Sequence, residues 1–416
     1  MKRLLQLLTL TALAAAQASA MSAEFAGGGT PRDLRWRSPI IRIAVSTSIT
    51  SQNASIKADA DVLGALRRSV AEWESVTGLQ FRIESSDGQN VSAAGSAGDG
   101  ISLITIAPTQ ENMQLFAGDP FGESARTRVF YNRRGAITEG DIVLNPLQQF
   151  STDGTYGTFD LETTFAHEIG HLLGLRHSAV AGSIMAERIP RNGDVYVGPR
   201  TPTETDIAAI RDLYAIETGS CCGIVAGKLG IQSRTSKGMT VWAEDGQGRV
   251  TAQAEAGADG TYRIGGLADG KYQLFWQGRD ANGTSVGELG PATVEAGSQI
   301  ALSKRVVAEP SDLSIEYIGV NLQPGDAAVT LRAGRQYNIC LAGHGFSSGL
   351  ASVGFSSKLI HADQTSLIRQ DFGDKVDAMT IGITVDPDTR PGVYTLYAER
   401  RDGARAAIIG AVVVTK

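Results

Sequence analysis

The sequence predicts an α+β domain followed by two all-β sandwich domains. Apolar residues recur at helical spacing only before about residue 219. After residue 222 this spacing is lost, and short runs typical of strands alternate with Asp-Gly and Pro-Gly turn signals. The chain has 416 residues, which is too many for one ordinary hydrophobic core.

The first twenty residues have the pattern of a signal peptide. A short positive start precedes an apolar stretch and then Ala18-Ser19-Ala20, which has the small-x-small form of a cleavage site. We expect residues 1–20 to be removed, residues 21–29 to be a flexible leader, and the protein to be secreted, either outside the cell or into a periplasm. An uncleaved membrane anchor is the alternative. No later segment is long and apolar enough to be a membrane helix.

Residues 30–219 are expected to form the α+β domain. Helical spacing predicts three helices, over about residues 58–76, 161–173 and 203–219. Strand spacing predicts strands at about 41–45, 79–83, 101–106, 128–131 and 142–144. Asp160 can cap the second helix, and Thr203 with Asp206 has the spacing of a capping box at the start of the third.

The rest of the chain is expected to form two β-sandwiches, over residues 223–307 and 311–416. In the first, the strand-like runs 260–264 and 270–274 follow Asp-Gly turns, and this pattern resembles carboxypeptidase-regulatory-like or prealbumin-like sandwiches. The second resembles an immunoglobulin-like sandwich. We expect both to be spacer or stabilising modules, with binding of a surface or matrix ligand as the alternative.

The chain has three cysteines, Cys221, Cys222 and Cys340. A secreted chain can form one disulfide from them. Adjacent cysteines rarely bond each other, because the ring strains the peptide between them. We therefore expect one of Cys221 or Cys222 to bond Cys340. The alternative is that all three are free.

The strongest motif runs from His167 to His177 and reads His-Glu-Ile-Gly-His-Leu-Leu-Gly-Leu-Arg-His. On a helix, His167 and His171 leave the same face one turn apart, so both can bind one Zn²⁺. Glu168 lies near the metal but off the ligand axis, where it can act as a base toward a zinc-bound water. Gly174 lets the chain turn back, so that His177 becomes the third ligand. Three protein ligands leave one position open, which is typical of a catalytic zinc site.

A methionine follows at a characteristic distance from this motif. Ser183-Ile184-Met185 ends eight residues after His177. With these motifs, and with Ser178 directly after the third His, residues 35–215 resemble the matrixin branch of the metzincins. The resemblance implies an α+β metzincin catalytic domain with a twisted mixed sheet plus three helices, one catalytic Zn²⁺ and endopeptidase activity. It also implies that Met185 forms an apolar floor beneath the imidazoles without binding the metal.

The resemblance further implies where substrate and calcium bind. Residues 140–145 resemble the family's edge strand beside the cleft, and an extended substrate is expected to pair there with Ile142, Val143, Leu144 and Asn145. Asp141 and Asn145 are oxygen donors in the region where the family binds Ca²⁺. Two side chains do not make a calcium site, so surface polar residues are the alternative.

Some features of the family are not expected here. Residues 30–219 contain no His beyond the motif, so a second, structural zinc is not expected. No Cys precedes the domain and little chain lies before its first strand, so neither a cysteine-based latency nor the usual pro-domain is expected. Residues 186–190 depart from the family's usual wall of the main specificity pocket, so no cleavage preference is implied.

The composition narrows the range of partners. The net charge is -6 and the mature part has no basic run, so nucleic acid is not an expected partner. The expected partner is a protein or peptide substrate. One alternative is a non-catalytic secreted binding protein, which the intact Glu168 disfavours. Another is a zinc hydrolase acting on a non-peptide amide.

Overall fold

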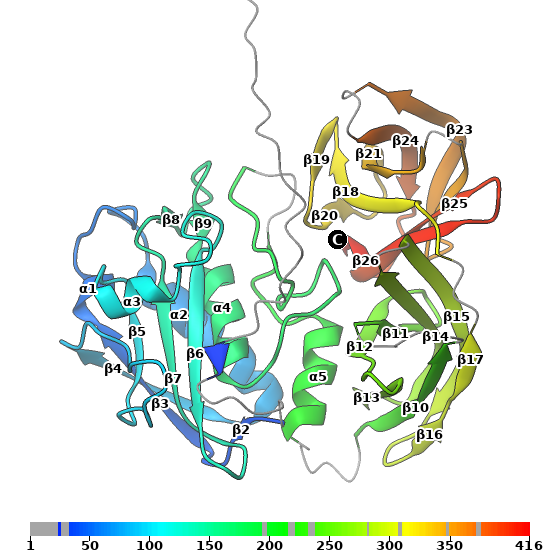
Figure 1. The fold of residues 1–416 in the computed structure, drawn as a ribbon. Coiled ribbons are helices and arrows are strands. Elements are labelled where there is room, and N and C mark those ends of the chain that lie inside the picture. The colour runs from blue at the N-terminus through cyan, green and yellow to red at the C-terminus, as the bar shows by residue number, and fades with distance from the viewer. Residues whose placement is uncertain are drawn as a thin grey trace, which may run out of the picture.

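The computed structural model describes residues 24–25, 33–193, 198–214, 221–231, 238–280, 283–306, 310–346, 349–371 and 376–416. The predicted signal peptide lies outside these residues, and of the predicted leader only the backbone of residues 24–25 is described. A mixed α/β part lies on one side of the molecule and two β domains on the other, with one helix, α5, between them (Figure 1). None of the described helices is both long and apolar enough to cross a membrane.

A seven-stranded mixed sheet forms the centre of the α/β part. Its order is β1-β6-β7-β5-β3-β4, and β2 pairs with β7. Strands β3, β4, β5 and β7 run parallel, and β6 is antiparallel to β7. The strands are β1 (Glu24–Phe25), β2 (Arg35–Trp36), β3 (Ile40–Ser46), β4 (Gln80–Ser86), β5 (Ser102–Thr105), β6 (Ala125–Tyr131) and β7 (Ala136–Leu144). A separate small pair is made by β8 (Phe150–Ser151) and β9 (Phe159–Asp160).

The order of this sheet corrects one prediction. Residues 142–145 were expected to form an edge strand beside the cleft, but β7 has partners on both sides. Ile142 of β7 pairs with Ile104 of β5 and also with Thr127 of β6. The predicted substrate-binding residues are all buried: Ile142, Val143, Leu144 and Asn145. The long strand next to the outer edge is β6, so the expected position of the edge was wrong by one strand.

Three longer helices accompany the sheet: α2 (Val62–Thr77), α4 (Leu161–Leu172) and α5 (Glu204–Tyr214). The first begins later than predicted, because Asp61 accepts a hydrogen bond from the Gly64 amide at 3.0 Å and so caps a helix that starts at Val62. The predicted end of the third helix lies outside the described residues. Two short helices were not predicted, α1 (Thr47–Thr50) and α3 (Gln110–Gln114).

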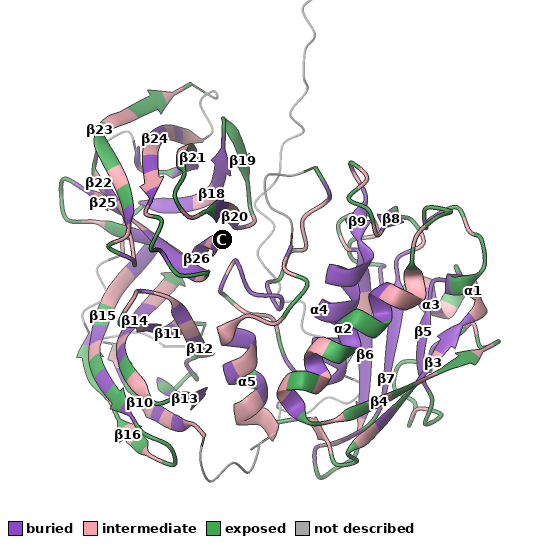
Figure 2. Ribbon diagram, turned by 180° about the vertical axis from the view of Figure 1, so that it is seen from behind, coloured by how far each residue is buried: buried purple, intermediate pink, exposed green. Residues whose placement is uncertain are grey.

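The packing of α2 on α4 fixes the position of α4. Trp73 of α2 is fully buried, and its indole Nε1 donates to the Ala166 carbonyl of α4 at 2.8 Å. Every residue of α4 is buried, because β6 and β7 also contact it (Figure 2). A helix enclosed in this way holds its side chains in fixed positions.

The first β domain consists of two four-stranded sheets packed face to face. One has the order β13-β10-β16 with β17 beside β10, and the other has the order β12-β11-β14-β15. Apolar side chains of both sheets form one buried cluster between them. The strands are β10 (Gly223–Ile231), β11 (Thr240–Asp245), β12 (Val250–Glu255), β13 (Thr261–Leu267), β14 (Gly270–Asp280), β15 (Gly283–Val294), β16 (Gln299–Ala301) and β17 (Lys304–Val306).

The second β domain pairs a five-stranded sheet with a four-stranded one. The orders are β19-β18-β21-β24-β23 and β20-β26-β25-β22, again with one buried cluster between the sheets. The strands are β18 (Ser314–Val320), β19 (Gln323–Gly325), β20 (Val329–Arg332), β21 (Gln336–His344), β22 (Leu350–Phe355), β23 (Ile360–Gln370), β24 (Asp377–Val385), β25 (Gly392–Arg400) and β26 (Arg405–Thr415). The all-β character predicted after residue 222 is confirmed among the described residues.

The predicted disulfide is also corrected. Cys221 and Cys222 bond each other, and Cys340 is a buried free thiol. Cys340 lies within β21 and pairs with Gly319 and Thr380, in the interior of the second β domain. Cys221 and Cys222 directly precede β10 of the first β domain. The sequence does not reveal that the third cysteine is enclosed in a different core.

This pairing predicts a specific labelling pattern. The native, non-reduced chain should show no reactive thiol, because Cys340 is enclosed in the sheet. Alkylation after unfolding without reductant, followed by peptide mass spectrometry, should label Cys340 alone. Label on Cys221 or Cys222 in that sample would contradict the pairing.

Candidate metal centre

Helix α4 presents the first two histidines. The Asp160 side chain accepts a hydrogen bond from the Thr163 amide at 2.9 Å, so the predicted N-cap is confirmed. His167 and His171 lie four residues apart on this helix and are both buried. Their ring centroids are 4.7 Å apart. The buried helix α4 therefore holds both imidazoles on one face, as expected from their spacing of four residues.

The turn after α4 brings in the third histidine. Gly174 has φ 102°, and a Cβ there would lie 2.1 Å from the Leu34 carbonyl oxygen. Only glycine fits this turn. The ring of His177 lies 5.3 Å from that of His167 and 4.7 Å from that of His171, measured between centroids. The ligand nitrogens of the three rings all lie within 4.8 Å of one another.

Backbone carbonyls determine the orientation of two rings. Nδ1 of His167 lies 2.7 Å from the Ile184 carbonyl oxygen, and Nδ1 of His171 lies 2.9 Å from that of Leu175. A carbonyl can only accept, so each Nδ1 carries the proton and each Nε2 presents a lone pair. The two Nε2 atoms are 3.0 Å apart. Two facing lone pairs repel unless they share a cation, so this donor set fits a metal ion.

Burial keeps the imidazoles neutral. Burial, and secondly a neighbouring imidazole, lowers the pKa of each of the three rings to about 3. A neutral ring nitrogen is the form that binds a metal. Among the described residues, these three histidines are the group of close His, Cys, Asp or Glu side chains suited to hold an ion.

Met185, which is predicted to lie beneath the imidazoles, packs against α4. It is buried, and a Cβ on Gly170 of α4 would come within 2.3 Å of its sulfur, so the absence of a side chain at Gly170 lets Met185 reach the helix. Asp206 of α5 holds the same turn, because its carboxylate accepts from the Ile184 amide at 3.1 Å and from the Ser183 hydroxyl. Sequence reasoning gave Asp206 only a capping role, which its bond from the Thr203 amide at 2.8 Å supports.

Glu168 has a partner that the sequence did not indicate. The carboxylate is buried, and its Oε2 accepts a hydrogen bond from the Thr127 hydroxyl of β6 at 2.5 Å. Burial raises the pKa of Glu168 to about 7, while the bond from Thr127 acts in the opposite direction. Thr127 and Glu168 are 41 positions apart in the sequence, and no motif links them. They meet because β6 packs beside α4.

The side chains expected near calcium have other partners. Asp141 accepts from the Ser92 and Leu103 amides at 2.8 and 2.9 Å. Asn145 donates to the Pro120 and Glu123 carbonyls, both at 2.9 Å, and accepts from the Leu147 amide at 3.0 Å. Asp141 therefore joins β7 to Ser92 and to β5, and Asn145 holds the chain around residues 120–123 at the end of β7. The two histidines outside the motif, His344 and His361, are exposed.

Residues 35–215 match the family model described as Matrixin. This segment belongs to the matrixin family. It includes the three histidines, Glu168 and Met185, and membership implies zinc as the metal.

Two curated relatives agree with the matrixin assignment. The chain is similar to Metalloendoproteinase 1 of Glycine max, at 38% identity over 84 residues, which covers 19% of this chain and 22% of the relative. It is also similar to the Hatching enzyme of Paracentrotus lividus, at 29% identity over 170 residues, which covers 38% of this chain and 24% of the relative. The chain thus spans less than a quarter of either relative.

Two solved structures resemble parts of this chain weakly. One similar chain is the major pilin subunit of Bacillus cereus, with 13% identity, a TM-score of 0.17, and coverage of 47% of this chain and 70% of that one. Another is a putative carbohydrate binding protein from Pseudomonas aeruginosa, with 14% identity, a TM-score of 0.15, and coverage of 22% and 94%. Likeness at this level supports no conclusion about the β domains.

The geometry predicts one zinc ion per chain. Replacing His177 by Ala should remove it, because the remaining two imidazoles leave an incomplete ligand set. Zinc content is measured by atomic emission after dialysis. The matched control is His361→Ala, an exposed histidine outside the site, which should keep the metal. Unchanged zinc in the His177 variant would refute the three-histidine site.

Proposed function

We propose that this chain is a secreted zinc-dependent endopeptidase that hydrolyses peptide bonds in extended protein segments. The observation that carries the proposal is the convergence of three neutral imidazoles, with buried Glu168 next to the first, in a segment of the matrixin family. Secretion rests on the signal-like pattern of residues 1–20. We retain residues 30–219 as the catalytic domain, residues 223–307 as a carboxypeptidase-regulatory-like or prealbumin-like sandwich, and residues 311–416 as an immunoglobulin-like sandwich.

His167, His171 and His177 would hold the zinc ion and leave its remaining position open to water or substrate. When bound, the ion supplies a Lewis acid that activates water and polarises the scissile carbonyl. The chain's own contribution is orientation. The carbonyls of Ile184 and Leu175 fix the rings of His167 and His171.

Glu168 is the general base of the proposed reaction. It directly follows His167 on α4, and its carboxylate is buried beside the imidazoles. It takes the proton of the attacking water and later delivers it to the leaving amine. The Thr127 hydroxyl, bound to Oε2, orients the carboxylate during both transfers.

An extended substrate would pair with β6. This strand runs beside α4, and its Thr127 contacts Glu168. The same edge already accepts a short extended segment of the chain itself, because Glu24 and Phe25 pair with Arg128 and Val129. Main-chain pairing of this kind selects extended segments with little regard to side chains, which suits an endopeptidase. It replaces the earlier expectation that the substrate pairs with residues 142–145.

The proposal predicts that Glu168→Gln abolishes peptide hydrolysis and keeps the metal. Gln has nearly the same shape but cannot accept the proton, so the turnover rate should fall by roughly 100- to 10,000-fold. Turnover is followed with an unstructured fluorogenic peptide, and zinc is determined on the same samples. Glu84→Gln, on an exposed position of β4, is the matched control. A fully active Glu168 variant would remove Glu168 from its proposed role.

A further inference from the structure

Residues 178–185, which follow His177 and end at Met185, form a loop that we call the bridging loop. Its two ends lie at the metal centre, and its middle packs on the second β domain. The Ala181 amide donates to the Ile409 carbonyl of β26 at 2.8 Å. The pairing of β26 with β25 is irregular at this point, with a register shift between Tyr394 and Leu396. Such an irregularity redirects a strand toward a neighbouring group.

Two glycines allow the bridging loop and β26 to approach each other closely. A Cβ on Gly182 of the loop would lie 2.7 Å from Val413 and 3.0 Å from Val393. Gly410 of β26 has φ 68°, and a Cβ there would lie 2.4 Å from Val180 of the loop. Neither position tolerates a side chain without a shift of the loop or the strand. The loop and β26 therefore fit each other closely.

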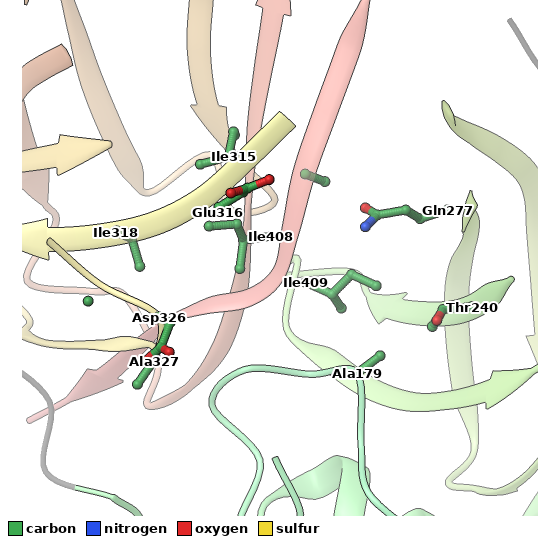
Figure 3. A pocket seen from close by; sticks show the side chains of 12 residues that line it. Ala179, Thr240, Gln277, Ile315, Glu316, Ile318, Asp326, Ala327, Ile408 and Ile409 are labelled. Atoms are coloured by element: carbon green, nitrogen blue, oxygen red, sulfur yellow. The ribbon is translucent and has the colours of Figure 1, made fainter. Parts of the chain in front are cut away.

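The contact is also apolar and enclosed. Val180 of the loop lies in a buried cluster with residues of both β domains: Trp242, Val250, Val393 and Ile409. At the margin of this contact a cavity of about 190 Å³ is lined by Ala179 of the loop together with residues of both β domains, and none of the three histidines reaches it (Figure 3). The three parts of the chain thus meet at the bridging loop.

The loop transmits this contact to the imidazoles. Its Ile184 carbonyl orients His167, and the Ser178 amide donates to the Met185 carbonyl at 2.7 Å, which closes the loop next to His177. A displacement at Val180 or Ala181 therefore moves the Ile184 carbonyl, which is hydrogen-bonded to His167. It also moves Ser178, which directly follows His177. Groups that orient metal ligands contribute to metal affinity.

The first β domain supports the same loop from another side. Asp206, which holds Ser183 and Ile184, belongs to α5, and α5 lies on β12 and β13. Glu204 of α5 pairs with Arg249 at 2.5 Å. A Cβ on Gly266 would lie 2.0 Å from the Ala208 carbonyl oxygen, so helix and strand are in direct contact.

We propose that the two β domains are part of the metal centre's support and that Ile409 and Gly410 are positioning residues for its histidines. They act through the bridging loop and touch neither metal nor substrate. The inference rests on the proposed zinc site but goes beyond it, because it gives the β domains a role in metal affinity. Loosening the contact between β26 and the loop weakens zinc binding in a chain that remains folded.

The test uses two glycines of the same domain in the full-length chain. Gly410→Ala forces a Cβ against Val180, whereas Gly403→Ala, at φ 87° in the turn before β26, meets nothing within 4 Å. Both carry the backbone cost of a positive φ, but only the first disturbs the loop. The zinc dissociation constant, measured by competition with a chromophoric chelator, should rise about 10-fold or more for Gly410→Ala and stay within about threefold for Gly403→Ala. The visible spectrum of the Co²⁺-loaded protein should change for Gly410→Ala alone.

A second pair of variants covers the case in which Gly410→Ala does not fold, as judged by circular dichroism. Val393→Ala removes methyl groups that contact the loop, and Val385→Ala removes them from the domain's own core. Only the former should weaken zinc binding. Equal zinc affinity in all folded variants and the unchanged chain would overturn the inference. An unchanged chain that binds no zinc would instead overturn the proposed function.

Discussion

The hydrogen bond from Nδ1 of His167 to the Ile184 carbonyl is the interaction on which the metal centre depends. It joins the helix that carries two ligands to the loop that follows the third. It also fixes the tautomer, so that Nε2 faces the neighbouring Nε2 of His171 at 3.0 Å. A buried ring nitrogen without this partner would cost about 1–3 kcal/mol, and the ring would be free to turn away. The bond therefore provides both stability and geometry.

Each end of this bond is held by a different part of the molecule. On the helix side, Trp73 fixes α4 through the Ala166 carbonyl. On the loop side, Asp206 binds the Ile184 amide, and α5 places Asp206. The first β domain contacts α5, and both β domains contact the bridging loop. The β domains were expected to be spacers or stabilising modules. Through their contacts with residues 178–185, the β domains pack against the loop next to the metal centre, although they contribute none of the three histidines.

The local part of the site could be predicted and the long-range part could not. The spacing of His167 and His171, the Asp160 cap and the glycine turn follow from helix geometry, which sequence displays directly. Which strand lies at the edge does not follow from helix geometry or local sequence, because only the order of strands in the sheet distinguishes β6 from β7. Thr127 and Ile409 are far in sequence from the groups they contact, and no pattern indicates either. The free thiol of Cys340 was missed for the same reason, since a core formed by distant strands encloses it.

In the proposed site, three imidazoles held by α4 and the bridging loop share one zinc ion. X-ray absorption at the zinc edge of the full-length, metal-loaded chain tests it most directly. We expect three imidazole nitrogens at about 2.0–2.1 Å and one further light ligand from water. A sulfur ligand at about 2.3 Å, or a shell with fewer than three imidazoles, would contradict it.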